Sequence, residues 1–169
     1  MIEEIALSAV AGGLVKLCDD IADRRLKVAG GYLFAAVYGT IIAYIATQTP
    51  LSSLWLGAVV AMVLMNKIDN GMHALAVLIV AAAVLLFNVN SFDFGYFLVF
   101  MAAAGADEIR FERKDIIARI SAHRLWLVAA SLLASLLSGY WLYFFSIASF
   151  DIAYSLIGRT LIKFYPERG

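Results

Sequence analysis

Near residue 20 the sequence carries a short acidic run that could hold a metal ion. Asp19, Asp20 and Asp23 follow Lys16. On a continuing helix the spacing i, i+4, i+7 places Lys16, Asp20 and Asp23 on one face. Two carboxylates one turn apart can bind Mg²⁺, which prefers oxygen ligands and can bridge to a diphosphate. The three aspartates are therefore candidate metal ligands, and the lysine is a candidate catalytic group. The alternative is a solvated helix end whose acids pair with its own bases.

A second group of polar residues runs from Asn66 to His73. Asp69 is a candidate general base or metal ligand, and His73 is a candidate proton acceptor. Lys67 and Asn66 are candidate substrate-binding residues, the lysine through a phosphate. In the alternative interpretation, Asp69 or Asn70 caps the helix that follows and His73 is an ordinary hydrogen-bonded residue between helices.

A third polar run starts at Asp107-Glu108 and reaches Arg124. Asp107 and Glu108 lie closest to the apolar segment before them, and Asp107 is a further candidate metal ligand. Arg124 begins the next apolar segment and is a candidate for binding an anionic head group. The residues between them are typical of a solvated connection whose local ion pairs contribute little to stability.

The composition places these polar runs in a membrane protein. Hydrophobic residues make up 63% of the 169 residues, charged residues 15%, and the mean hydropathy is +0.87. Soluble domains carry about 25% charged residues. Continuously apolar segments predict helices instead of membrane strands. We expect one all-α domain, residues 1–169, that forms a polytopic integral membrane bundle. Its predicted spans are roughly 4–20, 28–47, 51–67, 72–88, 93–108, 125–146 and 148–165.

All 13 Lys and Arg residues fall on one side once these spans are threaded through a bilayer. The loops expected on the other side, 47–53, 88–93 and 146–151, contain none. The positive-inside rule makes the basic side cytoplasmic, so the N-terminus lies outside and the C-terminus inside a cell membrane. The segment 148–165 either crosses as a seventh span or lies at the interface beside six. Because bases alternate with acids, nucleic acid is not an expected partner.

Three predicted spans are too short on apolar residues alone. The stretches Ile5–Val15, Leu51–Met65 and Phe94–Ala106 cover about 17 to 23 Å, against a hydrocarbon core of about 30 Å. Each is extended at its cytoplasmic end by one of the polar runs. Charges are costly inside a membrane, so we expect the three ends to converge on one water- or ligand-filled cavity. Local thinning of the bilayer is the alternative.

Two short stretches resemble known enzyme families. Asp20-Ile-Ala-Asp23 resembles part of the Asp-x-x-Asp motif of UbiA-type intramembrane prenyltransferases, which bind prenyl diphosphate through Mg²⁺. The chain departs from that family at Lys27, where a further acid is expected, and in having two helices fewer than the usual nine. Asp19-Asp20 with Asn66-x-x-Asp69 is similar to polyprenyl-phosphate phosphoglycosyl transferases, which are much longer. The Asp-Gly-x-x-Ala-Arg stretch of CDP-alcohol phosphotransferases is missing. Both resemblances imply a Mg²⁺-dependent transferase.

The function that the sequence favours is a small membrane enzyme acting on a phosphate- or diphosphate-bearing lipid of prenyl or polyprenyl type. Mg²⁺ is the expected cofactor, and membrane lipids and a phosphorylated lipid substrate are the expected partners. A second copy of the chain is kept as a further candidate partner. Two alternatives remain open: an ion- or proton-coupled transporter or channel that uses the same acids, and a non-catalytic assembly subunit.

Overall fold

The computed structural model describes residues 1–23, 30–109 and 125–164, and every regular element in them is an α-helix. The prediction of an all-α fold is confirmed. The helices are α1 (Ile2–Ala22), α2 (Gly31–Gln48), α3 (Ser52–Leu64), α4 (Gly71–Leu86), α5 (Phe94–Glu108), α7 (Leu125–Ser138) and α8 (Leu142–Phe164).

The predicted boundary between the last two segments is wrong. We expected a break near residue 147, whereas the chain turns at residues 139–141 and α8 continues through residues 146–151. Gly139 has a φ of +74°, a backbone conformation that glycine adopts without steric cost. The new turn also contains no basic residue, so the one-sided distribution of Lys and Arg is unchanged. The shift places Asp151 in the middle of a helix instead of an outer loop.

The helices differ in how well they suit a bilayer. Among the described residues, α2 is the one helix that is both long and apolar enough to cross a membrane. The apolar helices α3, α4 and α7 are shorter, with 13, 16 and 14 residues. A polytopic arrangement therefore remains a proposal.

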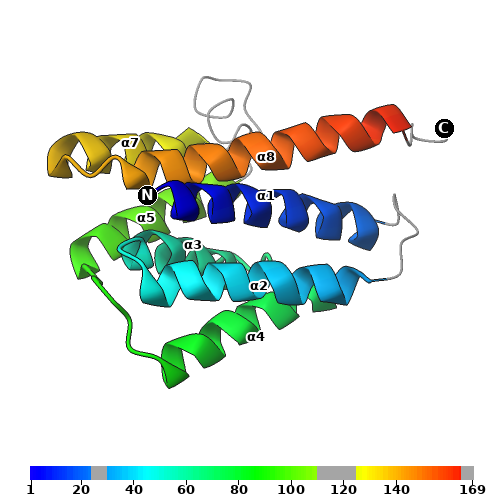
Figure 1. The fold of residues 1–169 in the computed structure, drawn as a ribbon, viewed down its shortest axis with the longest axis horizontal. Coiled ribbons are helices and arrows are strands. Elements are labelled where there is room, and N and C mark those ends of the chain that lie inside the picture. Colours follow the sequence, from blue (N-terminus) through cyan, green and yellow to red (C-terminus); the bar gives the residue numbers. More distant parts are fainter. Residues whose placement is uncertain (24–29, 110–124, 165–169) are drawn as a thin grey trace.

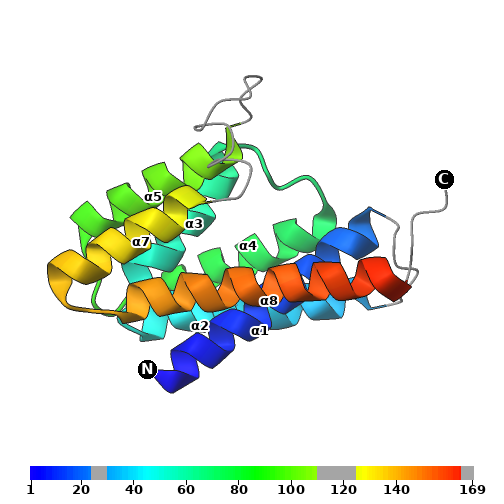
Figure 2. The same ribbon diagram turned by 90° about the horizontal axis from the view of Figure 1, so that it is seen from above.

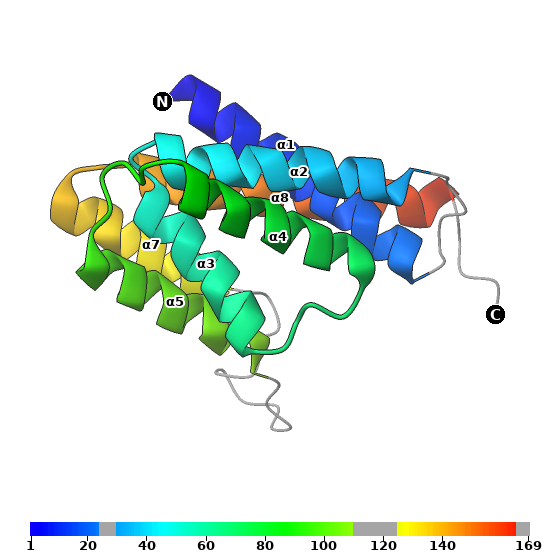
Figure 3. The ribbon, with the colours of Figure 1, turned by 90° about the horizontal axis from the view of Figure 1, so that it is seen from below.

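The helices described here (Figure 1) form two groups. In the first group, α1 packs on α8 and α2, and α2 packs on α4. In the second group, α5 packs on both α3 and α7. The groups meet at the end where α2 turns into α3 and α7 turns into α8, and they diverge toward the opposite end (Figures 2 and 3). We call the meeting end the apex and the other end the mouth.

Hydrogen bonds between turns hold the apex together. The Asn90 backbone N–H donates to the Thr47 carbonyl at 2.8 Å, and the Asp93 N–H donates to the Ser53 hydroxyl at 2.7 Å. The Ser52 hydroxyl in turn donates to the Asn90 carbonyl. The connection between α4 and α5 is thereby tied to the turn between α2 and α3.

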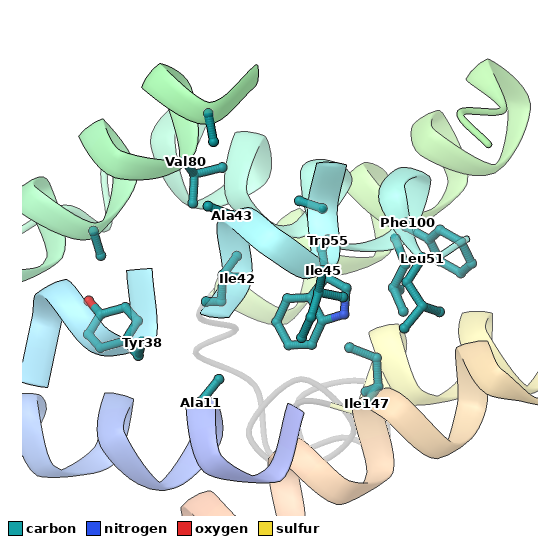
Figure 4. Close-up of a cluster of buried hydrophobic side chains, with 14 of the residues drawn as sticks. Ala11, Tyr38, Ile42, Ala43, Ile45, Leu51, Trp55, Val80, Phe100 and Ile147 are labelled. Carbon is teal, nitrogen blue, oxygen red and sulfur yellow. The ribbon is translucent and has the colours of Figure 1, made fainter. Parts of the chain in front are cut away.

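Large apolar side chains fill the space beside these turns. Leu51, Leu54 and Phe100 are completely buried, and Trp55 and Ile147 are nearly so. Figure 4 shows this cluster on the apex side of Ile42 and Tyr38, which both belong to α2. The packed apex therefore closes one end of the space between the two helix groups.

Small residues set the closest helix contacts. A β-carbon at Gly57 would lie 2.9 Å from the Phe97 carbonyl oxygen, and one at Gly39 would lie 2.8 Å from the Ala76 α-carbon. The backbones of α3 and α5, and of α2 and α4, approach this closely because neither glycine carries a side chain.

Candidate functional site

A cavity of about 360 Å³ lies between the two helix groups, with lining residues from all seven helices. Its deep end is formed by buried Ile42, Val80 and Ile147, and exposed Asp23 and Asp69 lie at the mouth. Members of all three polar runs line it. The predicted convergence of the three polar ends on one cavity is therefore confirmed for the described residues.

The charges around this cavity are unbalanced toward the negative. Among the described lining residues two are lysines, Lys16 and Lys67, and His73 adds an imidazole. Six are carboxylates: Asp19, Asp23, Asp69, Asp107, Glu108 and Asp151. Such a site attracts cations, and a phosphate group is best accommodated there together with a metal ion.

A hydrogen-bond chain crosses the polar wall of the cavity. His73 Nε2 lies 2.7 Å from Asp19 Oδ1, and His73 Nδ1 lies 2.6 Å from the Tyr38 hydroxyl. The Tyr154 hydroxyl donates to Asp19 Oδ2 at 2.6 Å. The chain joins α2, α4, α1 and α8 through one carboxylate and one imidazole.

This chain limits what His73 can do. The ring is 5% exposed and both of its nitrogens have partners. A neutral imidazole satisfies both contacts when Nε2–H donates to Asp19 and Nδ1 accepts from Tyr38. His73 therefore orients Asp19, and both residues line the cavity together with Tyr154. The role expected of His73 as a direct proton acceptor needs an available ring nitrogen, and both nitrogens are occupied in this arrangement.

The members of the first polar run separate in the structure. Lys16, Asp19 and Asp23 line the cavity, whereas Asp20 is 3% exposed and is not among the lining residues. Lys16 Nζ lies 3.1 Å from Asp20 Oδ1 and 5.3 Å from the centre of the Tyr154 ring. Asp20 thus pairs with a lysine of its own run, as the alternative expected, but Asp20 is buried and is not part of a solvated helix end.

In the second run two residues form helix ends, Asn66 after α3 and Asn70 before α4. Asn66 has a φ of +54° just after α3, where the N–H of Lys67 bonds the Met62 carbonyl and that of Asn66 bonds the Val63 carbonyl. This is the Schellman pattern of a helix end. The Asn70 side chain accepts from the N–H groups of Met72 and His73, so it caps α4.

Of the candidate site residues in the second run, some line the cavity and one does not. Asn66, expected to bind substrate, is exposed and lies outside the cavity lining. Lys67 and Asp69 do line the cavity. Lys67 Nζ is paired with Glu108 Oε2 at 3.1 Å, so it connects the α3–α4 loop with the end of α5.

In the third run Asp107 holds a helix start. Its two carboxylate oxygens accept from the N–H groups of Trp126 and Leu127, each at 2.9 Å. A carboxylate at the first turn of α7 also interacts favourably with the helix dipole. Its described partners are thus backbone groups, although it lines the cavity. Arg124 lies outside the described residues.

Tyr38, Asp151 and Tyr154 are polar cavity residues that the sequence analysis did not name as site candidates. Asp151 and Tyr154 are three residues apart on α8 and therefore share a face. A charged residue inside an apolar segment was the available signal. The misplaced helix boundary put Asp151 at the outer surface and hid it.

The described residues contain no group of three or more His, Cys, Asp or Glu side chains that could together hold a metal ion. Mg²⁺ shared between one or two carboxylates and a substrate phosphate does not need such a group.

Comparison of the chain with protein-family models, with curated proteins and with solved structures found no match. The arguments about function therefore depend on the geometry of the cavity.

Proposed function

We propose that this protein is a small integral membrane enzyme that acts on a lipid carrying a phosphate or diphosphate group. The observation that carries the proposal is the two-ended cavity, which is acidic at the mouth and apolar at the apex. A lipid with an anionic head group has the same division between its two ends. The cavity volume of about 360 Å³ also falls within the range of about 300–1,000 Å³ for small-molecule sites.

The exposed apolar surface supports a membrane location. Leu85 on α4 is 86% exposed and Leu137 on α7 is 75% exposed, and exposed leucines also occur on α2 and α8. Apolar surface on several helices of one small chain is expensive in water and is neutral in lipid. Lys16 and Lys67 line the cavity, and by the positive-inside rule the side of the membrane that carries the basic residues is cytoplasmic, so the cavity would open to the cytoplasm.

The residues at the mouth have distinct roles in this proposal. Asp23 and Asp69 would hold Mg²⁺, which would supply positive charge for the phosphate group of the substrate. Lys16 and Lys67 stabilise charge that develops on the phosphate oxygens during transfer. Asp19, oriented by His73, accepts a proton from an attacking hydroxyl group.

Thermal unfolding of the purified protein tests this assignment. We expect Mg²⁺ with farnesyl diphosphate to raise the unfolding temperature of the wild type, since a ligand at a hundred times its Kd stabilises by about 2.7 kcal/mol. Asp23→Asn and Asp69→Asn change exposed residues and should fold, yet lose most of this shift. Glu3→Gln alters an exposed acid at the apex end and serves as the matched control. An equal shift in all four proteins would rule the metal site out.

A cation- or proton-coupled transporter is the second candidate, and the excess of carboxylates around the cavity favours it. A transporter also needs a path through the apex, where Leu51, Leu54 and Phe100 are completely buried. The closed apex favours the enzyme. Cation flux into vesicles containing the purified protein would reverse this preference.

A further inference from the structure

The facing parts of α3 and α4 build an apolar wall of the cavity, in contrast to the wall that α1, α5 and α8 contribute. Helices α1, α5 and α8 contribute charged side chains such as Lys16, Glu108 and Asp151. On α4 after His73, and along the whole of α3, each residue that lines the cavity is apolar. These residues are Trp55, Ala58, Val59 and Met62 of α3, and Ala76, Val77 and Val80 of α4.

This apolar wall is not sealed by helix packing. Among the described helices, α3 packs on α5 and α2, and α4 packs on α2, while α3 and α4 do not form a packed pair. Figure 3 shows them diverging toward the mouth, where the loop 65–70 connects them. Val59, Met62 and Val77 are half-buried although they line the cavity, and the neighbouring Val63 and Leu78 are exposed. The apolar cavity wall is thus continuous with the apolar outer surface.

We propose that the hydrocarbon chain of a membrane lipid enters the cavity sideways between α3 and α4 and ends against Trp55. This inference rests on the proposed function, which assigns the head group to the acidic mouth. The loop that carries Lys67 and Asp69 joins the same two helices. The site for the head group therefore lies next to the opening through which the chain would enter. Lateral entry lets the chain pass from lipid to protein without crossing water.

The cavity's size and floor indicate the kind of chain. A volume of about 360 Å³ lies near the lower end of the ligand-site range, which fits one chain and not two. Trp55 is held in place as the floor, because its indole N–H donates to the Ser146 hydroxyl at 3.1 Å and its ring meets Phe150 edge-on at 5.4 Å. The substrate class is therefore a single-chain lipid, such as a prenyl phosphate, whose inner end stops at a fixed depth.

Quenching of Trp55 fluorescence tests lateral entry. Trp126→Phe and Trp141→Phe leave Trp55 as the one tryptophan. In phosphatidylcholine vesicles that contain dibromostearic acid, a brominated single-chain lipid, we expect Trp55 to be strongly quenched because a chain reaches the cavity floor. Val77→Phe narrows the opening and should abolish most of the quenching. Leu78→Phe, on the exposed side of the same helix, is the matched control and should leave it unchanged.

Two results would overturn the inference. One is a Trp55 that bromine does not quench, and the other is full quenching in a folded Val77→Phe protein. Should circular dichroism show that Val77→Phe does not fold, Ala58→Phe on the facing helix carries the same test. The assay needs neither Mg²⁺ nor a phosphate substrate. Loss of the Mg²⁺ response with quenching retained therefore contradicts the proposed enzyme alone, and the reverse result contradicts the chain site alone.

Discussion

At the scale of single residues, the hydrogen-bond chain from Tyr38 through His73 and Asp19 to Tyr154 defines the polar wall of the cavity. Each member comes from a different helix, so the chain fixes both the orientation of Asp19 and the relative positions of four helices. Buried polar groups cost free energy when they lose a partner, and the network is therefore sensitive to the loss of any one hydroxyl.

Replacing Tyr38 by phenylalanine tests this role. The change leaves Nδ1 of buried His73 without its hydroxyl partner, which should lower the free energy of unfolding by about 1–3 kcal/mol. Tyr44→Phe removes a hydroxyl from the exposed 3.3 Å contact with Glu3 and should cost less than about 0.5 kcal/mol. Denaturant unfolding in detergent compares the two. Equal stability of both variants would show that the chain is not a structural unit.

The sequence predicted which charged residues line the cavity better than it predicted their hydrogen-bond partners. Lys16, Asp19, Asp69 and Asp107 were identified because charges at the end of a short apolar segment are conspicuous. The role of Asn70 as a helix cap was one of the stated alternatives, since capping depends on local chain positions. Tyr38 gave no signal, because a tyrosine within an apolar segment is ordinary until its partner on another helix is known.

At the scale of elements, apolar segments predicted the number of helices in the described residues, and the first five boundaries agree within a few positions. The boundary between α7 and α8 was wrong because the sequence is apolar on both sides of it. Hydropathy averages over such a region, whereas the turn depends on one glycine, Gly139, at a positive φ. That single error also displaced Asp151 from the predicted site.

The contact between α3 and α5 gives a prediction at this scale. Gly57→Ala places a methyl group 2.9 Å from the Phe97 carbonyl oxygen and should destabilise the protein by about 1–3 kcal/mol, because backbone cannot yield as a side chain does. Gly105→Ala meets its nearest neighbour, the Met65 side chain, at 3.9 Å and should be neutral or stabilising. Thermal unfolding of both variants measures the difference. A Gly57→Ala protein as stable as Gly105→Ala would contradict the close packing.

At the scale of the whole molecule, the two helix groups meet at a packed apex and open toward a charged mouth (Figures 2 and 3). The one-sided charge distribution predicted which helix ends lie together. It could not predict which helices pack as pairs, because apolar segments of similar composition carry little information about their neighbours. The sequence therefore did not show that α3 and α4 are not packed against each other, nor that they build the apolar wall of the cavity.

The central claim is that one cavity binds an anionic head group at its mouth and an apolar chain at its apex. Calorimetric titration of geranyl diphosphate and of inorganic diphosphate, each with Mg²⁺, into the purified protein and two variants tests it most directly. We predict that Asp69→Asn weakens the binding of both ligands, whereas Val77→Phe weakens geranyl diphosphate and leaves inorganic diphosphate unchanged. If Val77→Phe affected both ligands equally, or neither, head group and chain would not share this cavity.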